Sequence, residues 1–296
     1  MPVGTPVCYR HPAREAHVRC TRCDRPICPD CMNSASVGFQ CPECVAEGRR
    51  TVRAPRTAFG GSQAGQHGYV TYTLIGLNVL VAVFSMLVSG LAALGGGGGL
   101  FGGSTPLHTA GAIIGIALDG SGQVIGVATG EYWRLFTAMF LHYGLLHLAV
   151  NMWALWILGR YLESTLGPVR FLALYLISGL GGSVAVYWLS APNAATAGAS
   201  GAIFGLFAAL FVINRKLSRD NSGIIGLLII NLAITFMPGL NISWSGHLGG
   251  LVTGGLVALG MAYAPKSQRV PVQVAASVAL VVLLMVLTVT RTGMLA

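Results

Sequence analysis

Long apolar segments recur through most of this chain, and each is close to the roughly 20 residues that an α-helix needs to cross a lipid bilayer. Hydrophobic residues make up 54% of the sequence and charged residues only 9%, which excludes an ordinary soluble protein. The sequence therefore predicts an all-α polytopic membrane protein with seven spans. They are placed at residues 70–90, 145–164, 169–190, 198–214, 222–238, 244–263 and 271–290.

Basic residues lie almost entirely on one side of these predicted spans. With a cytoplasmic N-terminus, every Lys and Arg except Arg134 and Arg291 falls on the cytoplasmic side, which is the positive-inside pattern. No cleavable signal peptide is predicted, because the first 69 residues are polar and lack an early apolar core. The predicted location is the plasma membrane, with a cytoplasmic N-terminus and an extracellular C-terminus.

The net charge of +9 does not indicate a nucleic acid partner, because the basic residues lie beside spans or among cysteines rather than on one face. Residues 47–69 contain several arginines and glycines and are predicted to form a flexible basic linker. Placed just before the first span, this linker would lie against anionic headgroups. The lipid bilayer is therefore the partner expected for these charges.

All seven cysteines occur before residue 45, in pairs with two residues between the members. His11 completes the first pair, so four pairs supply eight ligands, the number that two tetrahedral zinc sites require. A set of disulfides is the alternative, but seven is an odd number and the predicted compartment is reducing. His17 is a spare candidate ligand. The pairs are Cys8 with His11, Cys20 with Cys23, Cys28 with Cys31, and Cys41 with Cys44.

The favoured pairing of these ligands is interleaved along the chain. This plan resembles the cross-braced B-box-like zinc fingers, and it covers a predicted domain at residues 1–46. A domain this small has little core, so metal binding would supply much of its folding free energy. No catalytic cysteine–histidine pair is visible, so the domain is predicted to be a module that binds a partner protein or has a regulatory role. The two sites are Cys8, His11, Cys28 and Cys31, and Cys20, Cys23, Cys41 and Cys44.

A serine, Ser200, lies near the start of the fourth predicted span, within the sequence AGASGAIFG at residues 197–205. Serine among small residues also suits close helix packing and then needs no chemistry. The sixth span carries His247, however, and a histidine inside a membrane is a functional hypothesis by default. A serine nucleophile needs a base within hydrogen-bond reach, and histidine is the usual one. Neither span contains an acidic residue, which favours a two-residue Ser200/His247 arrangement.

Small residues at four-residue spacing indicate that these two spans pack closely against each other. Ser200 and His247 each lie beside the first member of such a stripe, so close approach would bring the hydroxyl and the imidazole together. The stripes are Gly201, Gly205 and Ala209 in one span, and Gly246, Gly250, Gly254 and Ala258 in the other.

The second predicted span supplies two further polar side chains, His147 and Asn151, which are four residues apart and therefore share a helix face. Both can donate hydrogen bonds to a developing oxyanion, and so can the backbone N–H of Ser200 near a helix N-terminus. The alternative is an interhelical hydrogen-bond pair that only holds the bundle together.

Taken together, these motifs resemble the rhomboid family of intramembrane serine proteases. The resemblance rests on the serine motif Gly198-Ala199-Ser200-Gly201, on His247 followed by Leu248-Gly249-Gly250, on the His147 and Asn151 pair, and on Trp133-Arg134. It implies that Ser200 is the nucleophile, His247 the general base, and His147 and Asn151 oxyanion donors. Phe204 stands where family members often carry a tyrosine that packs on the catalytic histidine.

The resulting plan is a six-helix rhomboid-like bundle with one extra C-terminal transmembrane helix, preceded by a small zinc-binding domain. Residues 91–140 form a long external loop, which by the resemblance lies sideways in the membrane, and its glycine-rich part at 95–103 is predicted to be a mobile tether. The predicted domains are the zinc finger at 1–46, the linker at 47–69, the catalytic core at 70–265, and the seventh helix and tail at 266–296.

The predicted activity is that of an intramembrane serine endopeptidase that cleaves transmembrane proteins near their extracellular ends. Catalysis would need no cofactor, so Zn²⁺ would belong to the finger alone. One alternative is a non-proteolytic membrane adaptor that binds partners through the finger. The other is a seven-span transporter or receptor, which would need ionisable residues along a pathway rather than a cluster near one face.

Overall fold

The computed structural model describes residues 5–51, 55–90, 103–237 and 242–295. The chain divides into two compact units, Met1–Pro55 and Arg56–Ala296. Most of the glycine-rich stretch predicted to be a tether, residues 95–102, lies outside the described residues.

The first unit is built from short elements around its cysteines. Its buried cluster consists of six cysteines together with Ala16 and Ile27, so apolar side chains contribute little to its core. Strands β1 (Val18–Arg19) and β2 (Pro26–Ile27) pair antiparallel, as do β3 (Asn33–Ser34) and β4 (Phe39–Gln40). The 3-10 turn η1 (Pro29–Cys31) and helix α1 (Pro42–Thr51) complete the unit.

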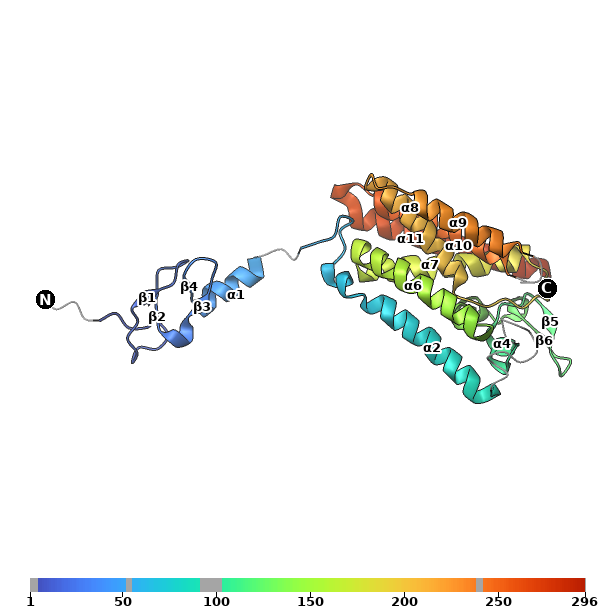
Figure 1. The fold of residues 1–296 in the computed structure, drawn as a ribbon, viewed down its shortest axis with the longest axis horizontal. Helices are drawn as coiled ribbons and strands as arrows, with labels where there is room; N and C mark the ends of the chain where they lie inside the picture. Colours follow the sequence, from blue (N-terminus) through green and yellow to red (C-terminus); the bar gives the residue numbers. More distant parts are fainter. Residues whose placement is uncertain (1–4, 52–54, 91–102, 238–241, 296) are drawn as a thin grey trace. The chain divides into compact units, whose positions relative to one another are not determined.

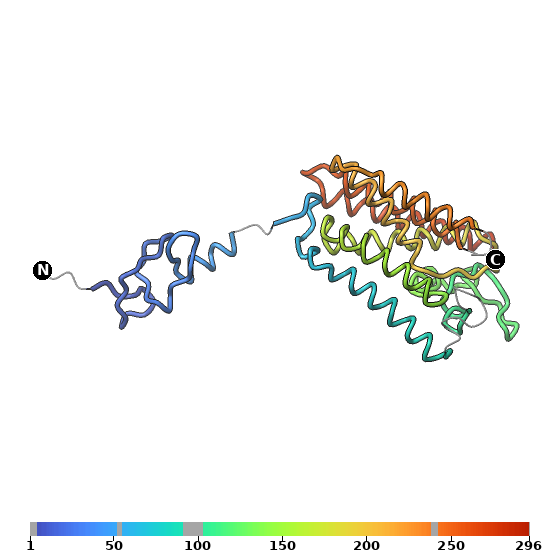
Figure 2. Tube along the Cα trace, viewed as in Figure 1, coloured from blue at the N-terminus to red at the C-terminus, as the bar shows by residue number. Residues whose placement is uncertain are grey.

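The second unit is a bundle of helices, which Figures 1 and 2 show packed side by side. Each of the seven predicted apolar segments coincides with one helix, and five of these helices are long and apolar enough to cross a membrane. The other two, α8 with 17 residues and α9 with 14, are shorter. The helices are α2 (Tyr69–Ser89), α6 (Gly144–Leu166), α7 (Pro168–Leu189), α8 (Ser200–Lys216), α9 (Ser222–Thr235), α10 (Trp244–Tyr263) and α11 (Arg269–Leu295).

Helices α8 and α10 touch through their backbones. A Cβ atom on Gly250 would lie 1.9 Å from the carbonyl oxygen of Gly201, and one on Gly254 would lie 2.3 Å from Cα of Gly205. The close approach predicted from the two stripes of small residues is therefore confirmed. Glycine is required at these positions because any side chain would push the helices apart.

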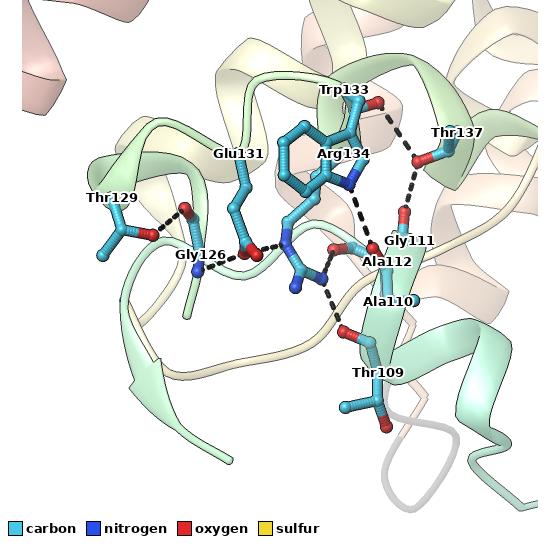
Figure 3. Close-up of polar contacts among 10 residues, drawn as sticks. All are labelled: Thr109, Ala110, Gly111, Ala112, Gly126, Thr129, Glu131, Trp133, Arg134 and Thr137. Carbon is cyan, nitrogen blue, oxygen red and sulfur yellow. Dashed lines mark hydrogen bonds and ion pairs between the residues drawn. The ribbon is translucent and has the colours of Figure 1, made fainter. Parts of the chain in front are cut away.

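The segment between α2 and α6 folds around Arg134, whose side chain is only 2% exposed (Figure 3). Its Nε lies 2.6 Å from Oε2 of Glu131, and its Nη1 donates to the carbonyl oxygens of Thr109 and Ala112. Trp133, by contrast, is 53% exposed. The short elements held here are α4 (Pro106–Gly111), β5 (Ala117–Leu118), β6 (Val124–Ile125), η4 (Val127–Thr129), α5 (Arg134–Thr137) and η5 (Ala138–Phe140).

A fully buried carboxylate, Glu163 near the end of α6, caps the start of α2. Its oxygens accept hydrogen bonds from the backbone N–H of Val70 at 3.0 Å and of Thr71 at 2.8 Å, and from Oγ1 of Thr71 at 2.7 Å. Among the described residues, Glu163 forms no ion pair with the nearby Arg160 or Arg170. The helix N-terminus satisfies the charge instead.

The range 47–69, predicted to be a flexible linker, contains ordered structure at both ends. Its first residues belong to α1, and η2 (Gln63–His67) precedes α2. Phe59 is buried in the core of the bundle, and a Cβ on Gly61 would lie 1.9 Å from the carbonyl oxygen of Leu166. Residues 56–67 are held against the bundle by the buried side chain of Phe59 and by the contact of Gly61 with the end of α6, which composition alone does not reveal.

Adding a methyl group at the α8–α10 contact should destabilise the bundle. We expect Gly250→Ala to cost about 1–3 kcal/mol, because the Cβ meets backbone that has no room to move. Gly255→Ala on the same helix is the matched control, since its Cβ would be 3.6 Å from Cβ of Ala208, an ordinary contact. Thermal unfolding in detergent measures both. Equal melting temperatures for the two variants would contradict this packing.

Candidate active site

A cavity of about 680 Å³ lies among the helices of the bundle, and all four predicted catalytic residues line it. His147 and Asn151 reach it from α6, Ser200 from α8 and His247 from α10. The structure therefore brings together side chains that are separated by as many as 100 residues in the sequence. Their shared cavity makes them candidates for one chemical site.

Ser200 is the first residue of α8, where the helix dipole favours negative charge. The chain enters this helix through Gly198, whose φ of 143° is a conformation that other residues rarely adopt. A Cβ on Gly198 would lie 3.0 Å from Nε2 of His147 and 3.7 Å from Oγ of Ser200. The missing side chain thus leaves open a small space that both groups border.

His247 lies in the first turn of α10, which begins where Oγ of Ser243 accepts a hydrogen bond from the backbone N–H of Gly246. Its ring is 6% exposed and stacks on Phe204, with ring centroids 4.0 Å apart and planes 14° apart. The stacking expected of a residue at position 204 is confirmed, without the tyrosine hydroxyl. Among the hydrogen bonds of the described residues, none joins Ser200 directly to His247. Such bonds are often long in the absence of substrate.

Thr235, the last residue of α9, contacts the imidazole of His247. Its Oγ1 lies 2.8 Å from Nδ1 of the imidazole and 2.7 Å from the carbonyl oxygen of Asn231, to which it can donate its single hydrogen. With that hydrogen directed to Asn231, the hydroxyl accepts a hydrogen bond from Nδ1–H of the neutral imidazole. In this tautomer Nε2 is unprotonated and can accept a proton from Ser200.

His147 is held in the opposite tautomer. The backbone N–H of Tyr143 donates to Nδ1 of His147 at 3.3 Å, so the ring proton sits on Nε2 and that nitrogen is a donor. Asn151 donates one N–H of its amide to the carbonyl oxygen of His147 at 2.8 Å, which leaves a second amide hydrogen on Nδ2. In these tautomers, Nε2 of His247 can accept a proton and Nε2–H of His147 can donate a hydrogen bond.

The sequence did not indicate Thr235, because its role depends on α9 meeting α10 in space. The threonine has no spacing relation to His247 and is separated from it by residues that include Pro238 and Gly239. A polar residue near the end of a mostly apolar span was the available signal. Thr235 is thus a polar neighbour of His247 that the sequence analysis did not name.

Comparison with known proteins identifies the family. Residues 129–264 match the Rhomboid domain. The putative rhomboid protease YdcA of Bacillus subtilis (strain 168) is 37% identical over 142 residues, which cover 47% of this chain and 71% of YdcA. The chain belongs to the rhomboid family. All four predicted catalytic residues lie within the matched rhomboid range, and the cysteine-rich unit lies outside it.

Two further rhomboid proteases are similar over different lengths. Rhomboid protease GluP of Bacillus subtilis (strain 168) is 37% identical over 207 residues, which cover 68% of this chain and 37% of GluP. Rhomboid protease AarA of Providencia stuartii is 32% identical over 169 residues, which cover 48% of this chain and 60% of AarA. The chain thus spans little more than a third of GluP. The family and the apolar helices together make this a multi-pass membrane protein.

The cysteine-rich unit forms two clusters of four ligand atoms, each with all atoms within 4.8 Å of one another. Their membership is the predicted interleaved one: Cys8, His11, Cys28 and Cys31 in the first, and Cys20, Cys23, Cys41 and Cys44 in the second. His17 belongs to neither and forms an exposed ion pair with Glu15.

The spacing of these atoms fits a tetrahedral zinc ion. Zinc–sulfur bonds of about 2.3 Å place neighbouring sulfur ligands about 3.7 Å apart. Sγ of Cys23 and Sγ of Cys41 are 3.7 Å apart, and Nδ1 of His11 lies 3.3 Å from Sγ of Cys28 and 3.4 Å from Sγ of Cys31. The seven cysteines are free thiols.

Local hydrogen bonds also suit metal binding by thiolates. Burial opposes ionisation of Cys8, but backbone N–H groups, including that of Cys28, lower the pKa of its thiol to about 6. In the same cluster, burial and the neighbouring thiols Cys8 and Cys28 raise the pKa of Cys31 to about 11. The sulfurs cannot all ionise together on their own, so the cluster favours a dication that balances their charge.

Metal content tests the two clusters separately. We expect the full-length protein to carry about two zinc ions per chain and the His11→Ala variant about one, because one cluster loses a ligand. His17→Ala is the matched control and should keep both ions. Elemental analysis of the purified proteins by mass spectrometry measures the ratio. Equal zinc loss in the two variants would contradict the assignment.

Proposed function

We propose that this chain is an intramembrane serine endopeptidase. The observation that supports the proposal most strongly is that Ser200, His247, His147 and Asn151 line one cavity, where Nδ1 of His247 contacts Oγ1 of Thr235 and Nδ1 of His147 accepts from the backbone N–H of Tyr143. One imidazole nitrogen is available to take a proton, and another is available to donate a hydrogen bond. Acyl transfer through a serine needs both functions.

The proposed reaction begins when Nε2 of His247 takes the proton of Ser200 and Oγ attacks the scissile carbonyl carbon. The carbonyl oxygen becomes an oxyanion, which accepts hydrogen bonds from Nε2–H of His147, from the amide of Asn151 and from the backbone N–H of Ser200. His247 then gives its proton to the leaving amine. His247 then takes a proton from a water molecule, which attacks the ester between the substrate and Ser200. This step releases the second product and restores the serine hydroxyl.

Thr235 stabilises the charge that forms during this reaction. When His247 takes the proton from Ser200 it becomes an imidazolium, and Nδ1–H then donates a stronger hydrogen bond to Oγ1 of Thr235. An aspartate usually fills this place in serine hydrolases. A hydroxyl orients the ring in the same way without a charge that would be costly to bury.

The proposed substrates are transmembrane proteins whose helices unwind near their extracellular ends. A helix hides its peptide bonds in its own hydrogen bonds, so a bond must be exposed before the serine reaches it. The cavity is bordered by α6 and α9, including Trp153 and Leu227, so an unwound segment could enter between these helices from the bilayer. No metal takes part in this chemistry, and the two zinc ions proposed for the finger would serve its fold and its protein partner.

The topology proposed for this protease has its N-terminus in the cytoplasm and its C-terminus outside the plasma membrane. The asymmetry of basic residues supports it, since all but Arg134 and Arg291 fall on one side. The starts of α8 and α10, with Ser200 and His247, are then nearer the extracellular face. Cleavage near the extracellular end of a substrate follows from that depth.

Replacing the nucleophile should abolish both covalent labelling and proteolysis. We expect Ser200→Ala to lose reaction with a fluorophosphonate probe, and Ser200→Ala and His247→Ala each to lower cleavage of a tethered transmembrane substrate by about a thousandfold or more. Ser183→Ala is the control, because this serine also lines the cavity. Labelling that persists in Ser200→Ala would refute the proposal, and wild-type protein that neither labels nor cleaves would favour the adaptor.

Removing the hydroxyl of Thr235 should slow the chemical step. Thr235→Val keeps the shape of the side chain but leaves Nδ1–H of His247 without its acceptor, so we expect kcat to fall roughly 10- to 100-fold with little change in KM. Thr235→Ser restores the hydroxyl and should restore most of the rate. Imidazole ¹⁵N chemical shifts measure the tautomer directly. A valine variant with an unchanged rate would exclude this positioning role.

A further inference from the structure

Three arginine side chains converge on the turn that precedes η2. Nη1 of Arg56 donates to the carbonyl oxygen of Gly60 at 3.1 Å. A Cβ on Gly60, where φ is 83°, would lie 3.4 Å from Nη1 of Arg269 and 3.6 Å from Nη2 of Arg170. These residues come from three segments that are far apart in the sequence. We call Arg56, Arg170 and Arg269 the arginine cluster.

No carboxylate pairs with the arginine cluster in the described part of the chain. The arginine ion pairs found there involve Arg14, Arg19, Arg22, Arg25 and Arg134. Nε of Arg170 donates to the neutral amide of Gln273 at 2.8 Å, and Arg56 and Arg269 both act on Arg170 electrostatically. Like charges gathered without a counterion repel one another, so the arrangement favours an anion between them.

The turn that carries the cluster is anchored. Phe59 is 3% exposed in the core, and the side-chain amide of Gln273 donates to the carbonyl oxygens of Phe59 at 3.3 Å and of Met261 at 2.9 Å. The backbone of Gly61 is in close contact with the carbonyl oxygen of Leu166. Binding therefore needs little reordering of the backbone around the guanidinium groups.

We propose that the arginine cluster binds the phosphate group of an anionic phospholipid. The cluster lies beside the end of α6 and near the starts of α7 and α11, and the ends of membrane-spanning helices are at the depth of lipid headgroups. Guanidinium groups present paired N–H donors that match phosphate oxygens. Free phosphate carries the same chemistry and is the alternative source. This inference does not depend on the proposed protease activity.

Native mass spectrometry of the full-length protein in detergent tests the site. Phosphatidylglycerol, phosphatidylcholine and inorganic phosphate are titrated separately. We expect one phosphatidylglycerol to be retained in preference to phosphatidylcholine, and the double variant R56Q/R269Q to weaken its binding roughly tenfold or more. The matched control is K266Q, which removes a charge from the same α10–α11 connection outside the cluster and should change binding about twofold at most.

The results of this titration distinguish specific binding at the arginine cluster from non-specific electrostatic attraction to acidic lipid. An equal loss in K266Q would overturn the proposal, as would unchanged lipid binding in R56Q/R269Q. Arginine-dependent binding of inorganic phosphate without a preference for phosphatidylglycerol would support the phosphate site and assign it to a soluble anion. Circular dichroism and gel filtration check the fold. The single variant R56Q, at an exposed side chain, gives a smaller loss of the same kind if the double variant is unstable.

Discussion

The contact between the backbones of α8 and α10 is the constraint on which the proposed chemistry depends. Gly201 follows Ser200 directly and its carbonyl oxygen meets Gly250, while a Cβ on Gly201 would lie 3.2 Å from the carbonyl oxygen of Gly246, the residue before His247. Proton transfer from a hydroxyl to an imidazole needs a separation close to 3 Å. Larger side chains at the α8–α10 contact would push the two helices apart, and Ser200 and His247 would then be too far apart for this transfer. The glycines thus set the packing distance on which the proposed proton transfer depends.

The polar groups of the cavity are arranged so that none needs a permanent charge. Each imidazole has an uncharged partner at Nδ1, the hydroxyl of Thr235 for His247 and the backbone N–H of Tyr143 for His147. A carboxylate beside His247 would hold the ring equally well but would be costly to bury within apolar helices. In the proposed reaction, charge forms only when the imidazolium and the oxyanion appear together and attract each other.

Features that depend on local spacing were predictable, and features that depend on distant contacts were not. His147 and Asn151 share a helix face because they are four residues apart, and the small-residue stripes foretold the helix contact. The eight candidate ligands followed from pair spacing and number, and the favoured interleaved pairing resembled that of cross-braced zinc fingers. Thr235 acts only because α9 reaches α10. The carboxylate of Glu163 likewise caps a helix that begins more than 90 residues earlier, so no pattern along the chain could identify its partner.

Glu163 and Arg134 differ from the arginine cluster in how their charges are balanced. Glu163 is fully buried and accepts three hydrogen bonds, and Arg134 is 2% exposed with a carboxylate and two carbonyl oxygens around it. Both charges are satisfied within the protein, so they stabilise the fold and need no ligand. In the arginine cluster, Arg56 and Arg170 each donate one hydrogen bond to a neutral group, and no carboxylate of the described residues pairs with the cluster. A bound phosphate would balance this charge, which is the reason for proposing a lipid site there.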